Sequence, residues 1–188
     1  MIQTERLILR NWRAEDRAPF KALCNSPEVM ACLGGVFDDA QVDANIGRIQ
    51  ACADANGFCF WALERRADGA FLGFCGLKVA HEPGLPTVEG EIEIGWRLRH
   101  DAWGQGYARE AALASLRWAW ANLPARRVIA MTVAANRRSW GLMERIGMTR
   151  RPELDFGHPG FPETHHLHRH IVYAVDRPVM PNAHPRSA

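Results

Sequence analysis

With 188 residues, 47% of them hydrophobic and 23% charged, the chain has the size and composition of one globular domain with a sizeable core. Its formal net charge of +2 gives no polyanion-binding signal, and no apolar run reaches the length of a membrane span, which argues against nucleic acid and membrane as partners. Five cysteines without paired metal-ligand spacing, and an N-terminus unlike a signal peptide, favour reduced thiols in a cytoplasmic protein without a bound metal.

The first third of the chain predicts a strand, two helices and a hairpin. Residues 6–10 are a short apolar run bounded by charge, which is typical of a strand. Acidic residues at Glu15 and at Asp38 stand where helices begin, and the pattern after each is helical. Two β-rich runs, 58–63 and 71–77, flank an Asp-Gly pair and therefore predict a hairpin.

The central strand is predicted over residues 88–98. Four apolar side chains alternate with Glu89, Glu91, Glu93, Gly95 and Arg97, which places those five on one face. Three carboxylates on one face repel one another, and this repulsion tends to raise a carboxyl pKa toward values that suit a general base. Glycine in the middle of a strand indicates a bulge or a close approach of another group.

Two glycines lie between this strand and the next helix, in Trp103-Gly104-Gln105-Gly106-Tyr107-Ala108-Arg109-Glu110. Glycine allows backbone angles that a side chain disfavours, and it lets the chain approach a ligand closely. The helix expected over 109–123 begins here, so its unpaired N–H groups and the positive end of its dipole point at the turn. Strand, glycine turn and helix start together predict a cradle for phosphate groups.

The rest of the chain alternates between strand and helix, so we expect a mixed sheet. The predicted elements are a buried strand over 128–133, a short helix from Arg137 or Ser139 to Gly147, a loop over 155–163 and a last strand over 168–175. Three prolines predict a frayed tail over 177–188.

Three motifs stand in order along the chain: Glu93-Ile94-Gly95-Trp96-Arg97-Leu98, then Gly106-Tyr107-Ala108, then Asn136-x-x-Ser139 followed by Glu144-Arg145-Ile146-Gly147-Met148. In order and spacing they resemble the central strand, the Q/R-x-x-G-x-G/A acyl-CoA loop and the second signature of the GNAT superfamily of N-acetyltransferases. The resemblance covers roughly residues 2–175. Trp103 stands where the general motif has Gln or Arg, and this is similar to the Rim-type branch, which acetylates N-terminal amines of ribosomal proteins.

The resemblance implies one GNAT domain over residues 1–176. Its fold would be α/β, a mixed, mostly antiparallel sheet with a splay at the central strand and helices on both sides. The resemblance also implies acetyl-CoA as cosubstrate, with the pantetheine arm inserted at the splay. The coenzyme contacts that it implies are Trp96, Arg97, Leu98, Gly104, Gln105, Gly106, Tyr107, Ala108, Arg109 and Asn136.

Transfer of an acyl group from a thioester to an amine needs a base, donors for an oxyanion and an exit for the thiolate. Glu93 is the candidate base and Glu91 its reserve; alternatively this face is only solvated, or Arg97 neutralises Glu93. Ser139 stands where the Rim-type branch carries a serine at the leaving thiolate, and Met143 occupies the position of the tyrosine that other members use.

Several alternatives stay open from the sequence. Asn136 contacts the pantetheine arm or caps a helix. The acceptor is expected to be a primary amine, either a protein N-terminus or a small molecule, and a homodimer is one option for assembly. The rival function is a non-catalytic acyl-CoA sensor. The tract from His165 to His170 resembles a metal site, but we favour a surface strand or a rim that contacts substrate.

Overall fold

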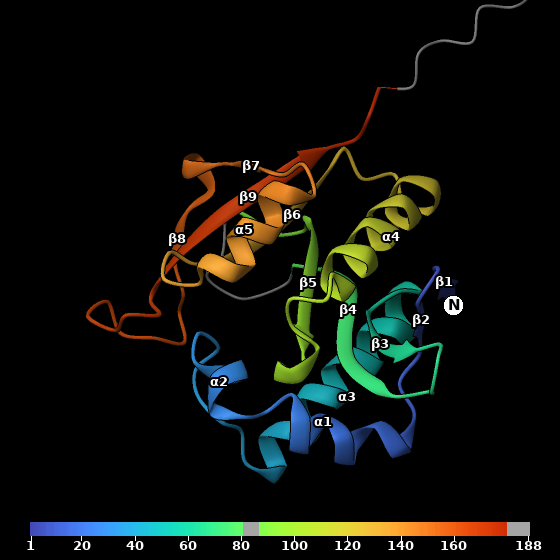
Figure 1. Cartoon of the computed structure of the whole chain (residues 1–188). Helices are drawn as coiled ribbons and strands as arrows, with labels where there is room; N and C mark the ends of the chain where they lie inside the picture. Colours follow the sequence, from blue (N-terminus) through green and yellow to red (C-terminus); the bar gives the residue numbers. More distant parts are fainter. Residues whose placement is uncertain (81–86, 180–188) are drawn as a thin grey trace, which may run out of the picture.

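The computed structural model describes residues 1–80 and 87–179 (Figure 1). The strands are β1 (Ile2–Gln3), β2 (Leu7–Arg10), β3 (Phe60–Arg65), β4 (Phe71–Val79), β5 (Ile92–Leu98), β6 (Arg127–Val133), β7 (Thr149–Arg150), β8 (Phe156–Gly157) and β9 (Arg169–Asp176). The helices are α1 (Arg17–Leu23), α2 (Pro27–Met30), α3 (Asp39–Asn56), α4 (Tyr107–Asn122) and α5 (Arg137–Arg145), with short 3-10 turns at Ala14–Asp16, His100–Ala102 and Pro152–Leu154.

The strands form one mixed sheet in the order β1-β2-β3-β4-β5-β6-β9-β7, with β8 also paired to β9. Every pairing is antiparallel except that of β5 with β6. The predicted fold class, a mixed and mostly antiparallel sheet flanked by helices, is confirmed. Within the described residues no helix combines the length and apolar character that crossing a bilayer requires.

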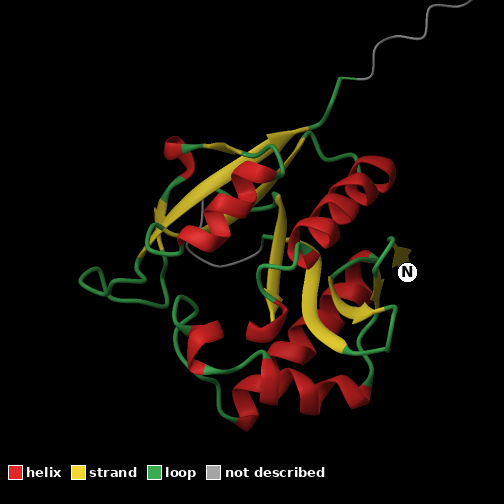
Figure 2. Ribbon diagram, in the orientation of Figure 1, coloured by secondary structure: helices red, strands yellow, loops and turns green. Residues whose placement is uncertain are grey.

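Helices cover both faces of the centre of the sheet (Figure 2). Phe74 and Cys75 are successive residues of β4, so their side chains point to opposite faces. Phe74 packs on Phe20 of α1, with ring centroids 6.2 Å apart, whereas Cys75 lies 3.9 Å from Ser115 of α4. The face with Phe74 therefore carries the early helices, and the opposite face carries α4.

The sheet opens between β5 and β6. These strands pair only at two positions, Ile92 with Val128 and Glu93 with Ile129, and the pairing then stops although both strands continue. Figure 1 shows β5 running beside β4 while β9, the next neighbour of β6, slants away. The predicted splay is confirmed. The register between β4 and β5 runs unbroken through Gly95, so the splay needs no bulge against β4 there.

Two predicted strands begin later in the structure than the sequence indicates. The central strand begins at Ile92, four residues later than predicted, because residues 87–90 form a turn in which Gly90 has a φ of 76°. Residues 165–168 form turns rather than a strand, and β9 begins at Arg169. Most of the expected tail, residues 180–188, lies outside the described residues, as do residues 81–86.

Candidate active site

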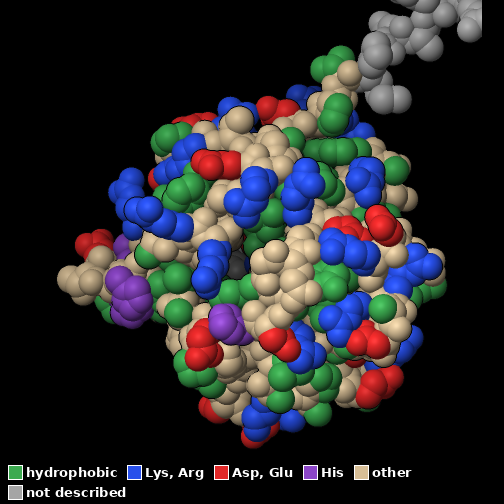
Figure 3. All heavy atoms as spheres, viewed as in Figure 1, with side chains coloured by type: hydrophobic (Ala, Val, Ile, Leu, Met, Phe, Trp, Pro, Cys, Tyr) green, Lys and Arg blue, Asp and Glu red, His purple; other side chains and the backbone are tan. Residues whose placement is uncertain are grey.

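A cleft of about 1290 Å³ lies over the point where β5 and β6 separate. One side is formed by the turn from Trp103 to Arg109 and the start of α5, and the other by α2 and the aromatic side chains of β3 and β4. Figure 3 shows a hollow near the middle of this face, with Lys and Arg side chains along its border. The arginines that line the cleft are Arg97, Arg109, Arg137, Arg138 and Arg145.

The glycine turn has the backbone that the sequence predicts. Gly104 and Gly106 have φ values of 76° and 82°, and Gly106 is the N-cap of α4. This left-handed region disfavours any side chain, so both positions require glycine. The Trp103 indole N–H donates to the Leu98 carbonyl at 2.9 Å, which fastens the turn to the end of β5. The indole N–H of Trp103 thus positions the glycine turn relative to β5, which explains why a tryptophan stands here.

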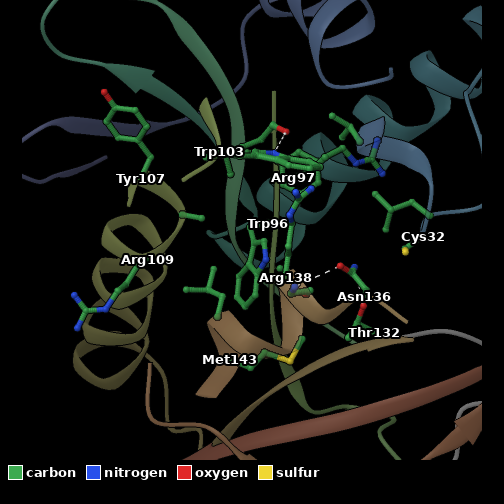
Figure 4. A pocket seen from close by; sticks show the side chains of 18 of the residues that line it. Cys32, Trp96, Arg97, Trp103, Tyr107, Arg109, Thr132, Asn136, Arg138 and Met143 are labelled. Carbon is green, nitrogen blue, oxygen red and sulfur yellow. Dashed lines mark hydrogen bonds between the residues drawn. The ribbon is translucent and has the colours of Figure 1, made fainter. Parts of the chain in front are cut away.

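The side chains of the turn mostly point away from the cleft. Gln105 does not line it and donates to the Asp101 carbonyl at 2.8 Å. The Tyr107 ring is buried under the Arg6 guanidinium and points away from the pocket in Figure 4. Arg109 is exposed on the first turn of α4. The turn therefore offers its backbone to a ligand, as a phosphate cradle requires, and the coenzyme contacts of these residues remain predictions.

The start of α5 closes one side of the cleft. Asn136 is its N-cap: the side-chain oxygen accepts from the Ser139 N–H at 3.4 Å, and the amide donates to Thr132 at 3.1 Å. The capping alternative is therefore realised, while a contact with coenzyme remains a prediction. Ser139 and Met143 both line the cleft, and the Arg138 guanidinium lies 4.8 Å from the centre of the Trp103 ring.

The carboxylates near the fork have separate partners. Glu93 is buried on β5, lines the cleft and has the Lys78 ammonium 3.1 Å from its carboxylate. Glu91 pairs with Arg127 at 2.6 Å and does not line the cleft. The expected row of three repelling carboxylates is wrong, because β5 begins only at Ile92, and Glu91 and Glu93 face different cations. Of the two candidate bases, only Glu93 is placed beside the fork.

Arg97 is placed differently from the other arginines. Its guanidinium lies over three phenylalanine rings, at 5.5 Å from Phe20, 5.3 Å from Phe37 and 5.4 Å from Phe74. The side chain therefore points toward Phe20 of α1 and Phe37, which lies just before α3. It does not neutralise Glu93, which pairs with Lys78. A coenzyme contact of Arg97 remains a prediction for its backbone.

Two other predicted contacts, Trp96 and Leu98, line the cleft from β5, on the strand face opposite to Arg97. Residues that sequence reasoning missed are Lys78 and Phe60. The Phe60 ring covers Gly95 so closely that a Cβ there would lie 2.8 Å from it. Lys78 and Phe60 lie on β4 and β3, the strands of the predicted hairpin, and a sequence does not state how those strands align with the central strand. The one signal of a close neighbour was the glycine in the middle of the strand, Gly95.

The histidine tract forms no metal centre. No group of metal-ligating side chains is present in the described part of the chain. The Nδ1 atom of His168 lies 2.8 Å from the Phe161 carbonyl, and His165 accepts from the Leu167 N–H. These hydrogen bonds stabilise the loop between Phe161 and His168.

Comparison with known proteins fits this geometry. Residues 6–149 match the family model described as an Acetyltransferase (GNAT) domain. The chain belongs to the GNAT acetyltransferase family. It is 33% identical over 146 residues to the Bacillus subtilis protein named "Uncharacterized protein YkkB", covering 77% of this chain and 83% of that one. It is 30% identical over 158 residues to FsC-acetyl coenzyme A-N(2)-transacetylase of Aspergillus fumigatus, covering 79% of this chain and 64% of that protein.

Solved structures agree with the fold. An acetyltransferase from Agrobacterium tumefaciens is 28% identical and superposes with a TM-score of 0.75, over 93% of this chain and 92% of that one. The ribosomal L7/L12 acetyltransferase RimL, in a complex with coenzyme A, is 13% identical with a TM-score of 0.71, over 92% and 95% of the two chains. At 13% identity, this similarity shows a common fold alone. The protein is therefore an acetyl-CoA-dependent acetyltransferase, whose acceptor the comparisons leave open.

Proposed function

We propose that this GNAT acetyltransferase moves the acetyl group of acetyl-CoA to a primary amine by direct attack within a ternary complex. The observation that carries the proposal is the position of Glu93. This carboxylate stands at the last paired residue of the β5–β6 fork, in the same cleft as the glycine turn and the start of α5. The assigned base, the proposed phosphate cradle and the splayed strands therefore all border the same cleft.

The residues divide the chemistry as follows. Glu93 accepts the proton that the acceptor ammonium must lose before its nitrogen attacks the thioester carbonyl. Beyond Glu93 the edge of β5 is no longer paired with β6, which leaves backbone groups to bind the pantetheine arm and the developing oxyanion. Ser139 is the hydroxyl we assign to the leaving thiolate. The backbone from Gly104 to Arg109 holds the pyrophosphate.

The acceptor is a primary amine of a protein N-terminus or of a small molecule. A Rim-type acceptor, the N-terminus of a ribosomal protein, is supported by the Trp-Gly-x-Gly-Tyr-Ala turn and by the shared fold of RimL. A small amine is supported by the apolar rings of Phe60 and Phe74, which line the cleft beside β5. We place the protein in the cytoplasm because all five cysteines are free thiols.

The test is thiol release from acetyl-CoA over a panel of peptides and small amines. We expect release that depends on the acceptor, with formation of the N-acetyl product confirmed by mass spectrometry. Coenzyme binding without release on any amine would instead favour an acyl-CoA sensor. An O-acetyl product on an acceptor that carries both groups would contradict amine transfer.

A further inference from the structure

Arg97 is a buried cation without a resident hydrogen-bond partner. The residue is 9% exposed, and its Nε and Nη1 atoms are buried with no acceptor among the described residues. Burial lowers the pKa of the guanidinium to about 10, so it still carries its charge at neutral pH. Three aromatic faces offset part of the lost hydration, but ring faces do not accept the N–H hydrogen bonds that water would. Unpaired buried N–H groups of this kind call for an acceptor from outside the fold.

The neighbours of Arg97 supply no negative charge. The titratable group that acts on it is Cys24, and burial raises the pKa of that thiol to about 12, so the thiol is neutral. Glu28 lines the same cleft, but its side chain is exposed and bonds to Ser26. Glu93, four residues away on the same strand, faces Lys78. Within the described residues, the charge of Arg97 is therefore uncompensated.

Arg97 and Glu93 lie on one strip of the cleft. Both side chains project from the same face of β5, with Gly95 between them. The missing side chain at Gly95 leaves room for the Phe60 ring, which stacks on Phe74 with centroids 5.3 Å apart. Four residues of strand separate the two charged groups by about 13 Å along the backbone. The strip thus runs from the assigned base, over two stacked rings, to a buried cation.

We propose that Arg97 is a specificity residue that binds a carboxylate of the acceptor, so that the acceptor is an amine carrying a carboxylate several bonds from its nitrogen. This inference rests on the proposed function, because it takes Glu93 to mark the amine end. A single cation among the rings of Phe20, Phe37 and Phe74 balances a single negative charge. A carboxylate matches that charge and the apolar surroundings better than a doubly charged phosphate, which would also lose more hydration.

The experiment uses matched acceptors that differ only in carrying a carboxylate or a carboxamide. We take ω-amino carboxylates of increasing length, their amides, and the corresponding ω-amino phosphonates. The wild type should use the best carboxylate with a kcat/KM about 10- to 100-fold above that of its amide, the span expected for a hydrogen bond to a charged group. In Arg97→Met, which keeps an unbranched apolar stem and loses the guanidinium, the preference should vanish through KM. Arg97→Lys should keep part of it.

The control variant is Arg48→Met, which removes an exposed arginine of α3 that does not line the cleft. It should leave the preference unchanged. Calorimetric binding of each acceptor to the CoA-bound protein gives a second readout that needs no turnover. If wild type binds carboxylates over amides and Arg97→Met does not, while no amine is acetylated, the anion site stands and the proposed function fails.

Other outcomes overturn the inference. Equal use of carboxylates and amides by the wild type would show that Arg97 does not select a charge. A stronger preference for phosphonates would assign the site to another anion. An equal loss on both acceptors in Arg97→Met, with a lower melting temperature, would make the arginine structural. If succinyl-CoA replaced acetyl-CoA as the better donor on a neutral amine and lost that advantage in Arg97→Met, the anion would belong to the donor.

Discussion

The two sides of the cleft handle positive charge in opposite ways. On the side of the glycine turn and α5, Arg109, Arg137 and Arg138 are exposed and reach water. On the side of the early helices one cation, Arg97, is enclosed by rings. Solvated charges attract any polyanion weakly, whereas a desolvated charge strongly favours one kind of group at one place. The first side thus suits a coenzyme common to a whole family, and the second suits selection of an acceptor.

The largest effect is expected from breaking the glycine turn. Gly106→Val places a branched side chain at a φ of 82°, and its Cβ would come within 3.3 Å of Arg6. For the wild type, acetyl-CoA at about 100 times its dissociation constant should raise stability by about 2.7 kcal/mol. In Gly106→Val this stabilisation should be absent. Thermal unfolding with and without acetyl-CoA measures both.

The matched control for that change is Gly69→Val in the turn between β3 and β4. Gly69 has a φ of 71° and does not line the cleft, so the backbone cost is similar and the ligand is not involved. Both variants should lose stability, and only Gly106→Val should lose the response to coenzyme. A full response in Gly106→Val would remove the cradle from this turn.

The second prediction separates the two glutamates. Glu93→Gln should lower turnover by about 100-fold near neutral pH, because it removes the proton acceptor at nearly constant shape. Glu91→Gln, which removes a carboxylate paired with Arg127 outside the cleft, should stay within a few-fold of wild type. The deficit of Glu93→Gln should shrink as pH rises, because more of the acceptor amine is then neutral. A pH series of kcat/KM checks this, and a larger loss in Glu91→Gln would exchange the roles.

A smaller effect is expected at Ser139. The thiol of CoA resembles cysteine, with a pKa of about 8.5, so its thiolate leaves without much help. Ser139→Ala should therefore slow thiol release by about 10-fold through loss of one hydrogen bond. Coenzyme affinity should stay nearly constant, because the phosphates bind elsewhere. Stopped-flow measurement gives the rate of thiol release, and equilibrium titration gives the affinity for coenzyme. Weaker binding at an unchanged rate would make Ser139 a pantetheine contact.

The contrast between the two sides also explains what the sequence could predict. The glycine turn and the cap of α5 are built from residues adjacent in the chain, so motif and spacing placed them. The splay lies between β5 and β6, which are far apart in the chain, and it was expected only from the family resemblance. Sequence reasoning also gave the correct fold class. It named Glu93, which lines the cleft and whose role as the base stays a prediction. It misjudged the partners of Glu91 and Glu93, because both cations, Arg127 and Lys78, come from neighbouring strands whose register a sequence does not state.

The surroundings of Arg97 could not be predicted from the sequence. Its rings come from α1, from Phe37 just before α3, and from β4, which are up to 77 residues away along the chain. In sequence, Arg97 is one more polar residue on an alternating strand, and its assignment to coenzyme followed from the family motif alone. Nothing local distinguishes a buried arginine from a solvated one. Only the packing of the early helices on β4 does so.

The smallest expected effect tests that burial directly. The pKa of Arg97 falls from its ordinary value to about 10 through desolvation, which corresponds to about 3 kcal/mol held against the coenzyme-free fold. Arg97→Met removes this cost together with the aromatic contacts of the cation, so a net gain of about 1 kcal/mol is expected. Because the folded pKa lies below the unfolded one, the cost is constant at every pH well below 10, shrinks as pH rises above that value, and vanishes only above the ordinary pKa of the unfolded chain.

Urea unfolding of the free protein at pH 7 and pH 9 measures this gain, which should be the same at both values and appear with an unchanged m value. Arg48→Met should stay within about 0.5 kcal/mol of wild type, as exposed substitutions do. A matching acceptor carboxylate should reverse the order, because it stabilises the wild type and not the variant. A variant that is less stable than wild type without ligand would mean that the rings alone satisfy the guanidinium, and Arg97 would then hold the early helices on the sheet instead of holding a substrate.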